Sequence, residues 1–473
     1  MVKIDRAVGG YALASVCGQV SVDLFNNLPN RFASQTYSGF AFKFMPGLDA
    51  YRSLPSYSVM SAKTVTAKKH VAGRHPESAT LRNVLIQRDA CTSDLCTEEM
   101  LFGLGGGVGC AYFLFDMYGG HPVVIGSRIH AKEGDIPYFT LQMTEGWGAT
   151  ADVRHSSSPS AATKSLVKIL NDGFIAIVWV ELTKLPYMFL ADHDMKVTPQ
   201  SWLAPFRNAY HQVVVYGMEG DDVLVGDLGN SVIRMSMEEL TEARNSHYAP
   251  KFRTVVISEA IAKPQLRATL SDRIRVTCSQ MLEGLGIANF GLAALNKWAQ
   301  MLTNTKNKKG WPNCFPGGPP LHGAMSSVFA QIELRGYGGS AFRGLYADFL
   351  DQAAGVLKKP ALKKVAGQFR ESEASWRAIS DAALPDSIPL LKETREALTR
   401  RSVLIRKPRT TAIDKELESL RDRFRQLHER SAKELSLSKA DTLDLFGVIS
   451  ERVLGTEKIE RAAFTELRSI VGQ

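Results

Sequence analysis

The sequence lacks any long hydrophobic run. Although 45% of its 473 residues are hydrophobic, no apolar stretch approaches the roughly 20 residues that a membrane-spanning helix requires. Lys3 and Arg6 precede a short apolar stretch, but this stretch contains glycines and lacks a clean signal-peptide cleavage motif. We therefore expect a cytoplasmic protein that does not associate with membranes.

Cysteine is scarce, and its spacing fits no metal-binding motif. Six cysteines are scattered along the chain, and the four-residue gap between Cys91 and Cys96 is neither a CxxC pair nor a zinc knuckle. Free thiols in a reducing cytoplasm are expected for all six. The segment 180–194 contains three carboxylates and one histidine, but their spacing indicates a surface turn rather than a metal site. We predict no metal and no cofactor.

Positive charge is in excess, with a formal net charge of +9. Such a balance favours an acidic partner without identifying it. The sequence contains no zinc finger, RNA-binding signature or basic heptad repeat. We therefore rank nucleic acid below a small acidic carrier protein as the expected partner.

The chain divides into four parts by composition. Residues 1–71 mix short strands and turns and are expected to form an N-terminal extension. Residues 72–262 alternate helical and strand patterns, and residues 263–399 carry helical spacing. Residues 400–473 combine a basic linker with a charged helical tail. We find no internal repeat.

Three strands are predicted in the second part. The segments 174–182, 211–219 and 222–228 are rich in β-branched residues. Gly220 and Asp221 suit a tight hairpin between the last two segments. An antiparallel sheet that follows N-terminal helices indicates an α+β fold.

Helix ends are marked by prolines, capping residues and glycines. Pro76 opens an amphipathic helix. The next helix is expected to be capped by Thr92 or Ser93 and to end at a glycine run. A further helix is expected to end at Gly173.

Two segments of the C-terminal half have unusual composition. The segment 310–323 is rich in proline and glycine and is predicted to be a loop. In the segment 413–435, charges alternate in sign on helical spacing, as in a solvent-exposed or coiled-coil helix. The open interpretations of this helix are a solvated face, a homodimer contact and a docking site for another chain.

The most suggestive chemical pair is His211 and Asp227. His211 starts one predicted strand and Asp227 lies at the end of the next, so the hairpin brings them within reach if both face one side. A carboxylate beside a histidine fixes its tautomer, as in the base half of a thiol or hydroxyl triad. The alternative is a solvated histidine and a turn aspartate.

A glycine run, "LFGLGGGVGCAYF", has glycines at the alternating positions 103, 105, 107 and 109, a pattern that is similar to but not the same as the GxGxxG fingerprint. It follows a helix and opens no clear one, so nucleotide binding is not favoured. Such a run lets backbones pack closely or turns amides toward an anion. Cys110 follows directly, either as a candidate thiol or as a small buried hydrophobe.

Several segments, in order, resemble the acyltransferase family typified by the butirosin biosynthesis protein BtrH. The resemblance extends over residues 72–380 and includes a helical domain of unknown function. Its segments are "GRHPESATLRNVL", "TEEMLFGLGGGVGCAYF", "VELTKLPY", "AYHQVVVYGMEGDDVLVGDLG", "SMEELTEARNS", "NFGLAALNKWAQ" and "LRGYGGSAFRGLYADFLDQAA".

The resemblance implies a papain-like cysteine-protease fold that transfers an acyl group from a carrier-protein thioester to an amine. A cysteine at the first helix would take the acyl group, with His211 as base and Asp227 as its orienting group. We assign substrate binding to residues beside that helix start and in or near the glycine run, namely His75, Glu77, Gly105, Gly106, Gly107 and Tyr112.

The nucleophile departs from the family pattern, because His-Cys-Glu-Ser is replaced by His75-Pro76-Glu77-Ser78. Ser78 is rotated about 200° around the helix from the required position. Cys110 could supply a displaced thiol from the glycine loop. Alternatively, the pocket persists without a covalent step, the register of the resemblance is misplaced at this helix, or His211 deprotonates the amine directly.

Two functions therefore compete. The first is an acyl- or aminoacyl-transferase of specialised metabolism, which takes its donor from an acidic acyl carrier protein and uses a small-molecule amine as acceptor. The second is a catalytically inactive pseudoenzyme that binds a partner or acts as a scaffold. A thiol hydrolase ranks last, because it needs the missing nucleophile more than transfer does.

Overall fold

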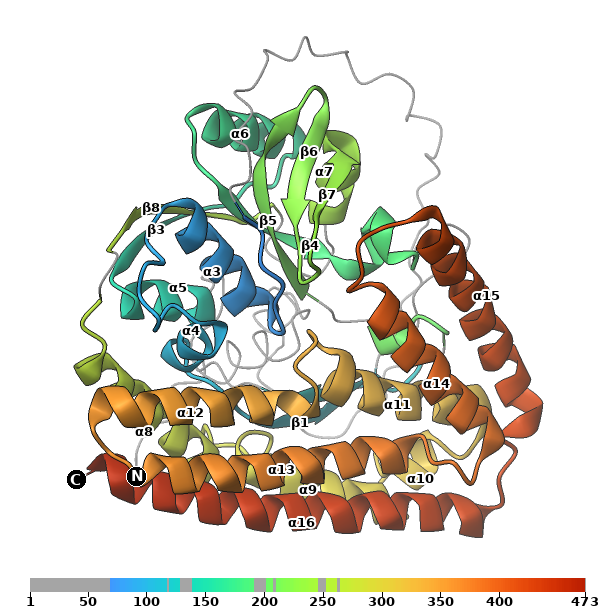
Figure 1. Cartoon of the computed structure of the whole chain (residues 1–473). Coiled ribbons are helices and arrows are strands. Elements are labelled where there is room, and N and C mark those ends of the chain that lie inside the picture. The colour runs from blue at the N-terminus through green and yellow to red at the C-terminus, as the bar shows by residue number, and fades with distance from the viewer. Residues whose placement is uncertain are drawn as a thin grey trace, which may run out of the picture.

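The computed structural model describes residues 69–116, 119–127, 138–190, 201–206, 210–245, 252–261 and 264–472. Most of the predicted N-terminal extension, Cys17 and the Asp192, His193 and Asp194 cluster lie outside these residues. Figure 1 shows a sheet region above layers of long helices. The predicted α+β class is confirmed.

The larger sheet has six antiparallel strands. They are β3 (Ala149–Arg154), β4 (Ala176–Glu181), β5 (Tyr210–Glu219), β6 (Asp222–Gly226), β7 (Val232–Ser236) and β8 (Thr254–Ala260). Their order is β3-β8-β4-β5-β6-β7. A second antiparallel sheet pairs β1 (Ala111–Leu114) with β2 (Val123–Gly126).

The predicted hairpin is confirmed, since β5 and β6 pair on either side of the Gly220 and Asp221 turn. Gly220 has φ +64°, a left-handed conformation that glycine adopts without a Cβ penalty. Val213, Val214 and Val215 of β5 are fully buried, so β5 is a central strand and its register is well specified.

Five helices accompany the sheet along the first half of the described chain. They are α3 (Pro76–Gln87), α4 (Glu98–Leu104), α5 (Tyr138–Gly146), α6 (Pro159–Asn171) and α7 (Met237–Arg244). Helix α3 contacts β5, α5 contacts β3, and α6 and α7 contact β4. The predicted ends at Pro76 and Gly173 are confirmed, and Gly173 has φ +83° just beyond α6.

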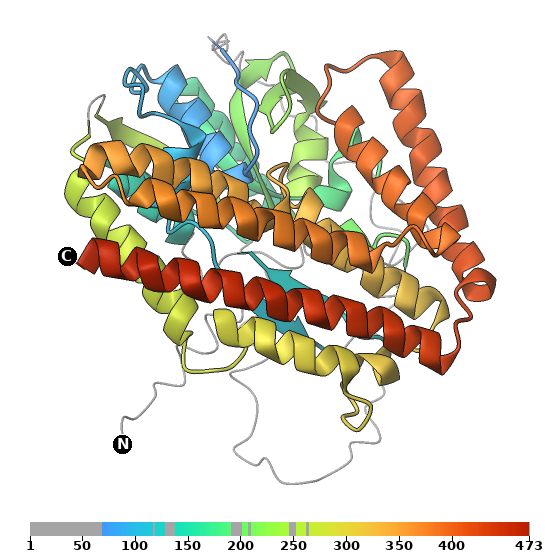
Figure 2. The ribbon, with the colours of Figure 1, turned by 60° about the horizontal axis from the view of Figure 1, so that its bottom comes forward.

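The second half is helical. Its helices are α8 (Arg267–Glu283), α9 (Leu292–Thr303), α10 (Trp311–Cys314), α11 (Gly318–Phe329), α12 (Arg343–Leu357), α13 (Leu362–Ala383), α14 (Pro389–Leu404), α15 (Thr411–Glu434) and α16 (Lys439–Gly472). Helix α16 runs between α9 and α13 along its length (Figure 2). It therefore belongs to the helical layer rather than to a free tail.

A buried ion pair joins α16 to the rest of the helical layer. The guanidinium of Arg343 on α12 donates to both carboxylate oxygens of Glu460 at 2.7 and 3.0 Å. Ser372 and Trp376 of α13 also donate to this carboxylate, each at 2.7 Å. Because the charges are fully buried, these hydrogen bonds offset the cost of desolvating them.

Helix α15 is amphipathic, and its apolar face is covered within the same chain. Leu417, Leu420, Phe424 and Leu427 are buried, and α15 contacts α11 and α14. The alternating charges occupy its outer side, where Arg430 pairs with Glu434. The charged side of α15 is therefore exposed in this chain, and the choice between a solvated face, a homodimer contact and a docking site stays a prediction.

The expectation of a loop at 310–323 is wrong. This segment contains α10 and the beginning of α11. Pro312, Pro319 and Pro320 lie in the first turns of these helices, where the missing N–H has no intrahelical acceptor. The prolines therefore begin helices instead of interrupting them.

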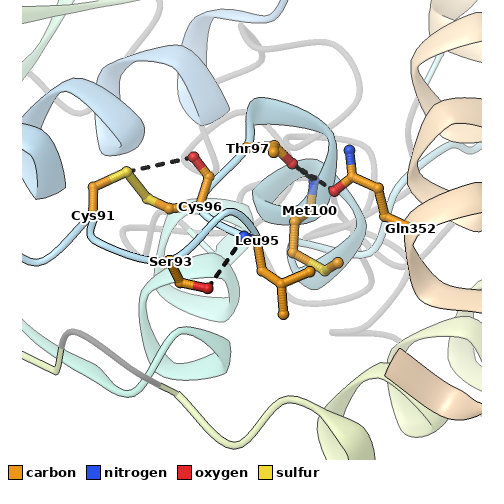
Figure 3. Close-up of a disulfide and its surroundings, with 7 residues drawn as sticks. All are labelled: Cys91, Ser93, Leu95, Cys96, Thr97, Met100 and Gln352. Atoms are coloured by element: carbon orange, nitrogen blue, oxygen red, sulfur yellow. Dashed lines mark hydrogen bonds between the residues drawn. A yellow bond between two sulfur atoms is a disulfide. The ribbon is translucent and has the colours of Figure 1, made fainter. Parts of the chain in front are cut away.

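A disulfide joins Cys91 and Cys96 in the loop between α3 and α4 (Figure 3). The expectation of free thiols is wrong for these two, whereas Cys110, Cys278 and Cys314 are free and buried. Four intervening residues suffice for the loop to turn back, and the two Cα atoms are 5.3 Å apart. That separation falls within the usual range for a disulfide.

The cap of α4 is Thr97, not Thr92 or Ser93 as predicted. Its hydroxyl oxygen accepts a hydrogen bond from the Met100 N–H at 3.1 Å and donates to Gln352 at 2.7 Å (Figure 3). The disulfide holds the preceding residues in a turn, so the helix begins only after that turn ends.

Candidate active site

His211 and Asp227 form a hydrogen-bonded pair at one end of the β5–β6 hairpin. His211 lies opposite Val180 of β4, and Asp227 follows the last residue of β6. The Nε2 atom of His211 is 2.5 Å from Oδ1 of Asp227, and both side chains are buried. The proximity predicted from the hairpin is confirmed, while the catalytic roles of both residues stay a prediction.

Further donors fix the carboxylate of Asp227. The Leu228 N–H donates to Oδ1 at 2.7 Å, and the hydroxyl of Tyr187, in a 3-10 turn at Pro186–Met188, donates to Oδ2 at 3.0 Å. Because Nε2 of His211 is engaged by this carboxylate, its neutral form carries the lone pair on Nδ1. The Nδ1 atom is therefore the position at which His211 can accept a proton.

The interaction between His211 and Asp227 shifts the pKa of each group. Burial works to lower the pKa of His211, but the charge of Asp227 and the hydrogen bond to it outweigh burial and raise that pKa. Burial works to raise the pKa of Asp227, but the charge of His211 and the hydrogen bonds to the carboxylate lower it. A histidine with a raised pKa is a stronger base when neutral, which suits general-base chemistry.

His75 caps α3 from inside the protein. Its Nδ1 accepts a hydrogen bond from the Ser78 N–H at 3.3 Å and lies 2.9 Å from the Ser78 hydroxyl oxygen. An accepting Nδ1 leaves the proton on Nε2, which lies 3.2 Å from Oε2 of Glu77. The fully buried ring makes T-shaped contacts with Phe102 and Phe342.

At the start of α3 the backbone contacts another buried carboxylate, that of Glu98 on α4. Glu98 accepts hydrogen bonds from the backbone N–H of His75 at 2.6 Å and from that of Arg74 at 2.8 and 3.0 Å. Burial raises the pKa of Glu98, although these N–H groups work to lower it. The sequence offered no signal for this residue beyond its place in the first turn of a helix.

The start of α3 lies against the strand that carries His211. The hydroxyl of Thr80 donates to Gln212 at 3.3 Å, and Gln212 donates to Thr140 of α5 at 2.9 Å. Glu77 is close enough for its charge to raise the pKa of His211. The structure thus brings Glu77, His211 and Asp227 into one site.

Pro76 occupies the first position of α3, where the family-like pattern has a cysteine. Pro76 is buried and supplies neither a nucleophile nor an N–H. Ser78 is also fully buried, and its hydroxyl faces His75. This contact agrees with the predicted rotation of Ser78 away from the nucleophile position.

Cys110 and Tyr112 lie where the glycine run meets the helical half of the chain. Burial raises the pKa of the Cys110 thiol to about 12, while Arg343 works to lower it and Glu460 to raise it. The Tyr112 hydroxyl accepts a hydrogen bond from Trp311 at 2.8 Å. A thiol protonated at neutral pH is a poor nucleophile, so the environment of Cys110 favours the buried hydrophobe over the displaced thiol.

Gly105, Gly106 and Gly107 form the turn that follows α4. Gly106 and Gly107 have φ angles of +110° and +64°, which glycine adopts without steric cost. A Cβ at Gly107 would lie 2.4 Å from the Tyr346 ring. Close packing, one of the two predicted uses of the run, is thus observed, while substrate binding by these glycines, His75, Glu77 and Tyr112 stays a prediction.

The described ranges contain neither a metal-ion cluster nor a membrane-spanning helix. Within them, no group of three or more His, Cys, Asp and Glu side chains is arranged to hold a metal ion. Across the same residues, no helix combines the length and apolar character needed to cross a bilayer.

Two known families match successive parts of the chain. Residues 75–228 match the family described as butirosin biosynthesis protein H, N-terminal. Residues 238–430 match a domain of unknown function, DUF4872. No curated protein matches the chain. The first match begins at His75 and ends at Leu228, so it includes both members of the buried pair.

Proposed function

Because the chain matches the BtrH-like family, with the butirosin biosynthesis protein H N-terminal domain followed by a domain of unknown function, we propose that it is an acyl- or aminoacyl-transferase of specialised metabolism. The family suggests an acyltransferase-like role and is consistent with a papain-like domain. The observation that carries the proposal is the His211–Asp227 hydrogen bond of 2.5 Å beside the start of α3.

In the proposed reaction, an amine attacks the carbonyl carbon of a carrier-protein thioester. His211 Nδ1 accepts the proton of the amine while the new C–N bond forms. The C–S bond then breaks, and the departing thiolate takes the proton from His211. Asp227 holds the ring orientation and stabilises the imidazolium that forms between these two transfers.

Direct transfer needs no side-chain nucleophile at Pro76. A thioester is already activated, and a positioned general base contributes roughly 10²–10⁴-fold in rate. Holding donor and acceptor together adds a further large factor, because the reaction becomes effectively unimolecular. These two effects together make transfer feasible without an acyl-enzyme.

One observation favours the alternative of a partner-binding pseudoenzyme. Proline at the first position of α3 removes the covalent step, and an intact fold without chemistry can still bind a carrier protein or scaffold another chain. The two functions differ in turnover, because a pseudoenzyme binds the loaded carrier but leaves its thioester intact.

The test is a transfer assay with an acyl-loaded carrier protein and a panel of small amines, read by mass spectrometry of the carrier and the amide product. We expect product with the wild-type protein and a loss of at least 100-fold in the His211→Ala variant. His155→Ala, which changes an exposed histidine, is the matched control. Equal carrier deacylation by the wild-type and His211→Ala proteins would refute the proposal.

A further inference from the structure

A pocket lies beside the His211–Asp227 pair. Asp227, which is hydrogen-bonded to His211, also lines this pocket. Tyr187, which donates to Asp227, also lines this pocket. The other walls come from the β6–β7 hairpin, from Tyr337 and from the connection between α14 and α15. The lining residues from the hairpin and this connection include Gly229, Ser231, Ile405, Lys407 and Arg409.

The connection between α14 and α15 reaches back to the sheet (Figure 1). A Cβ at Gly229 would lie 3.5 Å from the carbonyl oxygen of Ile405, so the hairpin and this connection are in contact. The Arg406 guanidinium donates to the Tyr337 carbonyl at 3.0 Å and lies 4.3 Å from the Tyr337 ring centre. These contacts hold the pocket walls together.

Four cations gather in or around this pocket. Besides Arg406, Lys407 and Arg409, the buried Arg401 donates to the Met188 carbonyl at 2.8 Å. The guanidinium of Arg401 also lies 4.6 Å from the centre of the Phe206 ring. The basic stretch noted in the sequence therefore has a definite place, beside the candidate active site.

The nearby carboxylates are already paired. Asp227 is bonded to His211, Arg409 is paired with Asp414, and Glu416, whose pKa the charge of Lys407 helps to lower, is paired with Arg400. No carboxylate in the described part of the chain forms an ion pair with the exposed Lys407. The local charge balance is therefore positive, which favours an anionic ligand.

We propose that this pocket binds the phosphate of a phosphopantetheine-type acyl donor, with Lys407 and Arg409 as its cationic contacts. The inference rests on the proposed function, since a carrier-protein thioester is borne on a phosphopantetheine arm. Lysine and arginine suit phosphate oxygens. Binding the remote, unreactive end of the donor supplies energy that positions its thioester, and Asp227 links this pocket to the catalytic pair.

The same phosphate chemistry occurs in coenzyme A and in the arm of a carrier protein. Calorimetric titration of the full-length protein with pantetheine 4′-phosphate and with pantetheine tests the phosphate itself. We expect pantetheine to bind at least tenfold more weakly, and the affinity for the phosphate form to fall with added salt. Competition by coenzyme A and by the phosphopantetheinylated carrier then distinguishes the two sources.

Variants assign the binding to this pocket. Lys407→Gln should weaken pantetheine 4′-phosphate at least fivefold, and Lys407→Arg should restore most of the affinity because it keeps the charge. Lys415→Gln removes an exposed lysine of α15 that does not line the pocket and should leave binding unchanged. The melting temperature of each variant reports whether it is folded.

Failure of this proposal is distinguishable from failure of the proposed function. Equal affinities for pantetheine and its 4′-phosphate, or equal affinities in the Lys407→Gln and Lys415→Gln variants, would overturn the phosphate pocket even if acyl transfer occurs. Conversely, phosphate-dependent binding that persists in His211→Ala, with no transfer by the wild-type protein, would support the pocket and reject the enzymatic role.

Discussion

The carboxylate of Glu98 lies beneath the start of α3 and accepts a hydrogen bond from the backbone N–H of His75 at 2.6 Å. The N–H of Arg74 donates to the same buried carboxylate. One side chain of α4 therefore fixes the path by which the chain enters α3. That path in turn sets the position of Glu77 relative to His211.

Replacing this carboxylate by an amide should weaken the fold. In Glu98→Gln, we expect the free energy of unfolding to fall by about 1–2 kcal/mol, because charge-assisted hydrogen bonds become neutral ones and an amide N–H faces backbone donors. Urea denaturation measures the change. Glu238→Gln, at an exposed glutamate of α7, is the control, and equal losses in both variants would contradict the positioning role of Glu98.

Restoring a thiol at the first position of α3 should restore a covalent step. We expect Pro76→Cys to gain the mass of one acyl group when it is incubated with an acyl-loaded carrier, because His211 can then activate the thiol. Intact-protein mass spectrometry detects the adduct. Pro76→Ala and Pro76→Cys/His211→Ala are the controls, and adduct formation independent of His211 would disprove the predicted geometry.

The charge of Asp227 should govern the pH dependence of transfer. Asp227 raises the pKa of His211, and only the neutral imidazole accepts a proton. In Asp227→Asn, the acid limb of the pH–rate profile should therefore move to lower pH. The plateau rate should fall by about two orders of magnitude or more, because the ring loses its fixed tautomer. An unshifted acid limb would show that Asp227 does not set the basicity of His211.

The helical half should lose stability in acid through His322. Burial, with a smaller effect of His428, lowers the pKa of His322 from 6.5 to about 3, and its Nε2 lies 2.9 Å from the Thr394 hydroxyl oxygen. Because the folded pKa lies below the unfolded one, this stability is present above pH 6.5 and is lost progressively as the pH falls toward 3. The loss from pH 7 to pH 5 is about 2 kcal/mol.

Urea denaturation at pH 7 and pH 5 measures this loss. In His322→Gln, which keeps a polar side chain beside Thr394, the difference between the two pH values should be smaller than in the wild-type protein by about that amount. His155→Gln, at an exposed histidine, should retain the wild-type difference. Identical pH dependence in all three proteins would exclude His322 as the titrating group.

The disulfide should contribute measurably to stability despite its short loop. In the double variant Cys91→Ser/Cys96→Ser, the free energy of unfolding should be about 2 kcal/mol lower than in the wild-type protein. Loop-closure entropy predicts this loss for a loop of this length. A reducing agent should destabilise the wild-type protein by a similar amount and leave the double variant unchanged. A wild-type protein insensitive to reductant would contradict this prediction.

Local sequence patterns were sufficient for much of the α+β half. β-Branched runs predicted β4, β5 and β6, and the turn at Gly220 and Asp221 predicted their hairpin, because strand propensity and turn chemistry act over a few residues. The same hairpin predicted the proximity of His211 and Asp227. Proline was interpreted correctly at Pro76 but not in the segment 310–323, where several prolines open helices.

Contacts between distant segments could not be predicted in this way. Glu98 contacts the start of α3 from the far side of the disulfide loop. Arg343 pairs with Glu460, which is 117 residues away in the sequence. The α14–α15 connection contacts Gly229. Such contacts depend on how whole elements pack, which neither periodicity nor capping specifies. The disulfide was missed for a related reason, since cysteine spacing alone does not show whether the loop turns back.

By itself, the sequence determined the fold class, the hairpin that carries the imidazole and carboxylate, and the absence of a side-chain nucleophile at Pro76, because each depends on residue identity and short-range geometry. Only the tertiary structure decided which groups surround that hairpin. Packing placed Glu77 near His211, buried Cys110 and gathered a basic connection beside Asp227, since burial and charge at a site are set by the elements that meet there.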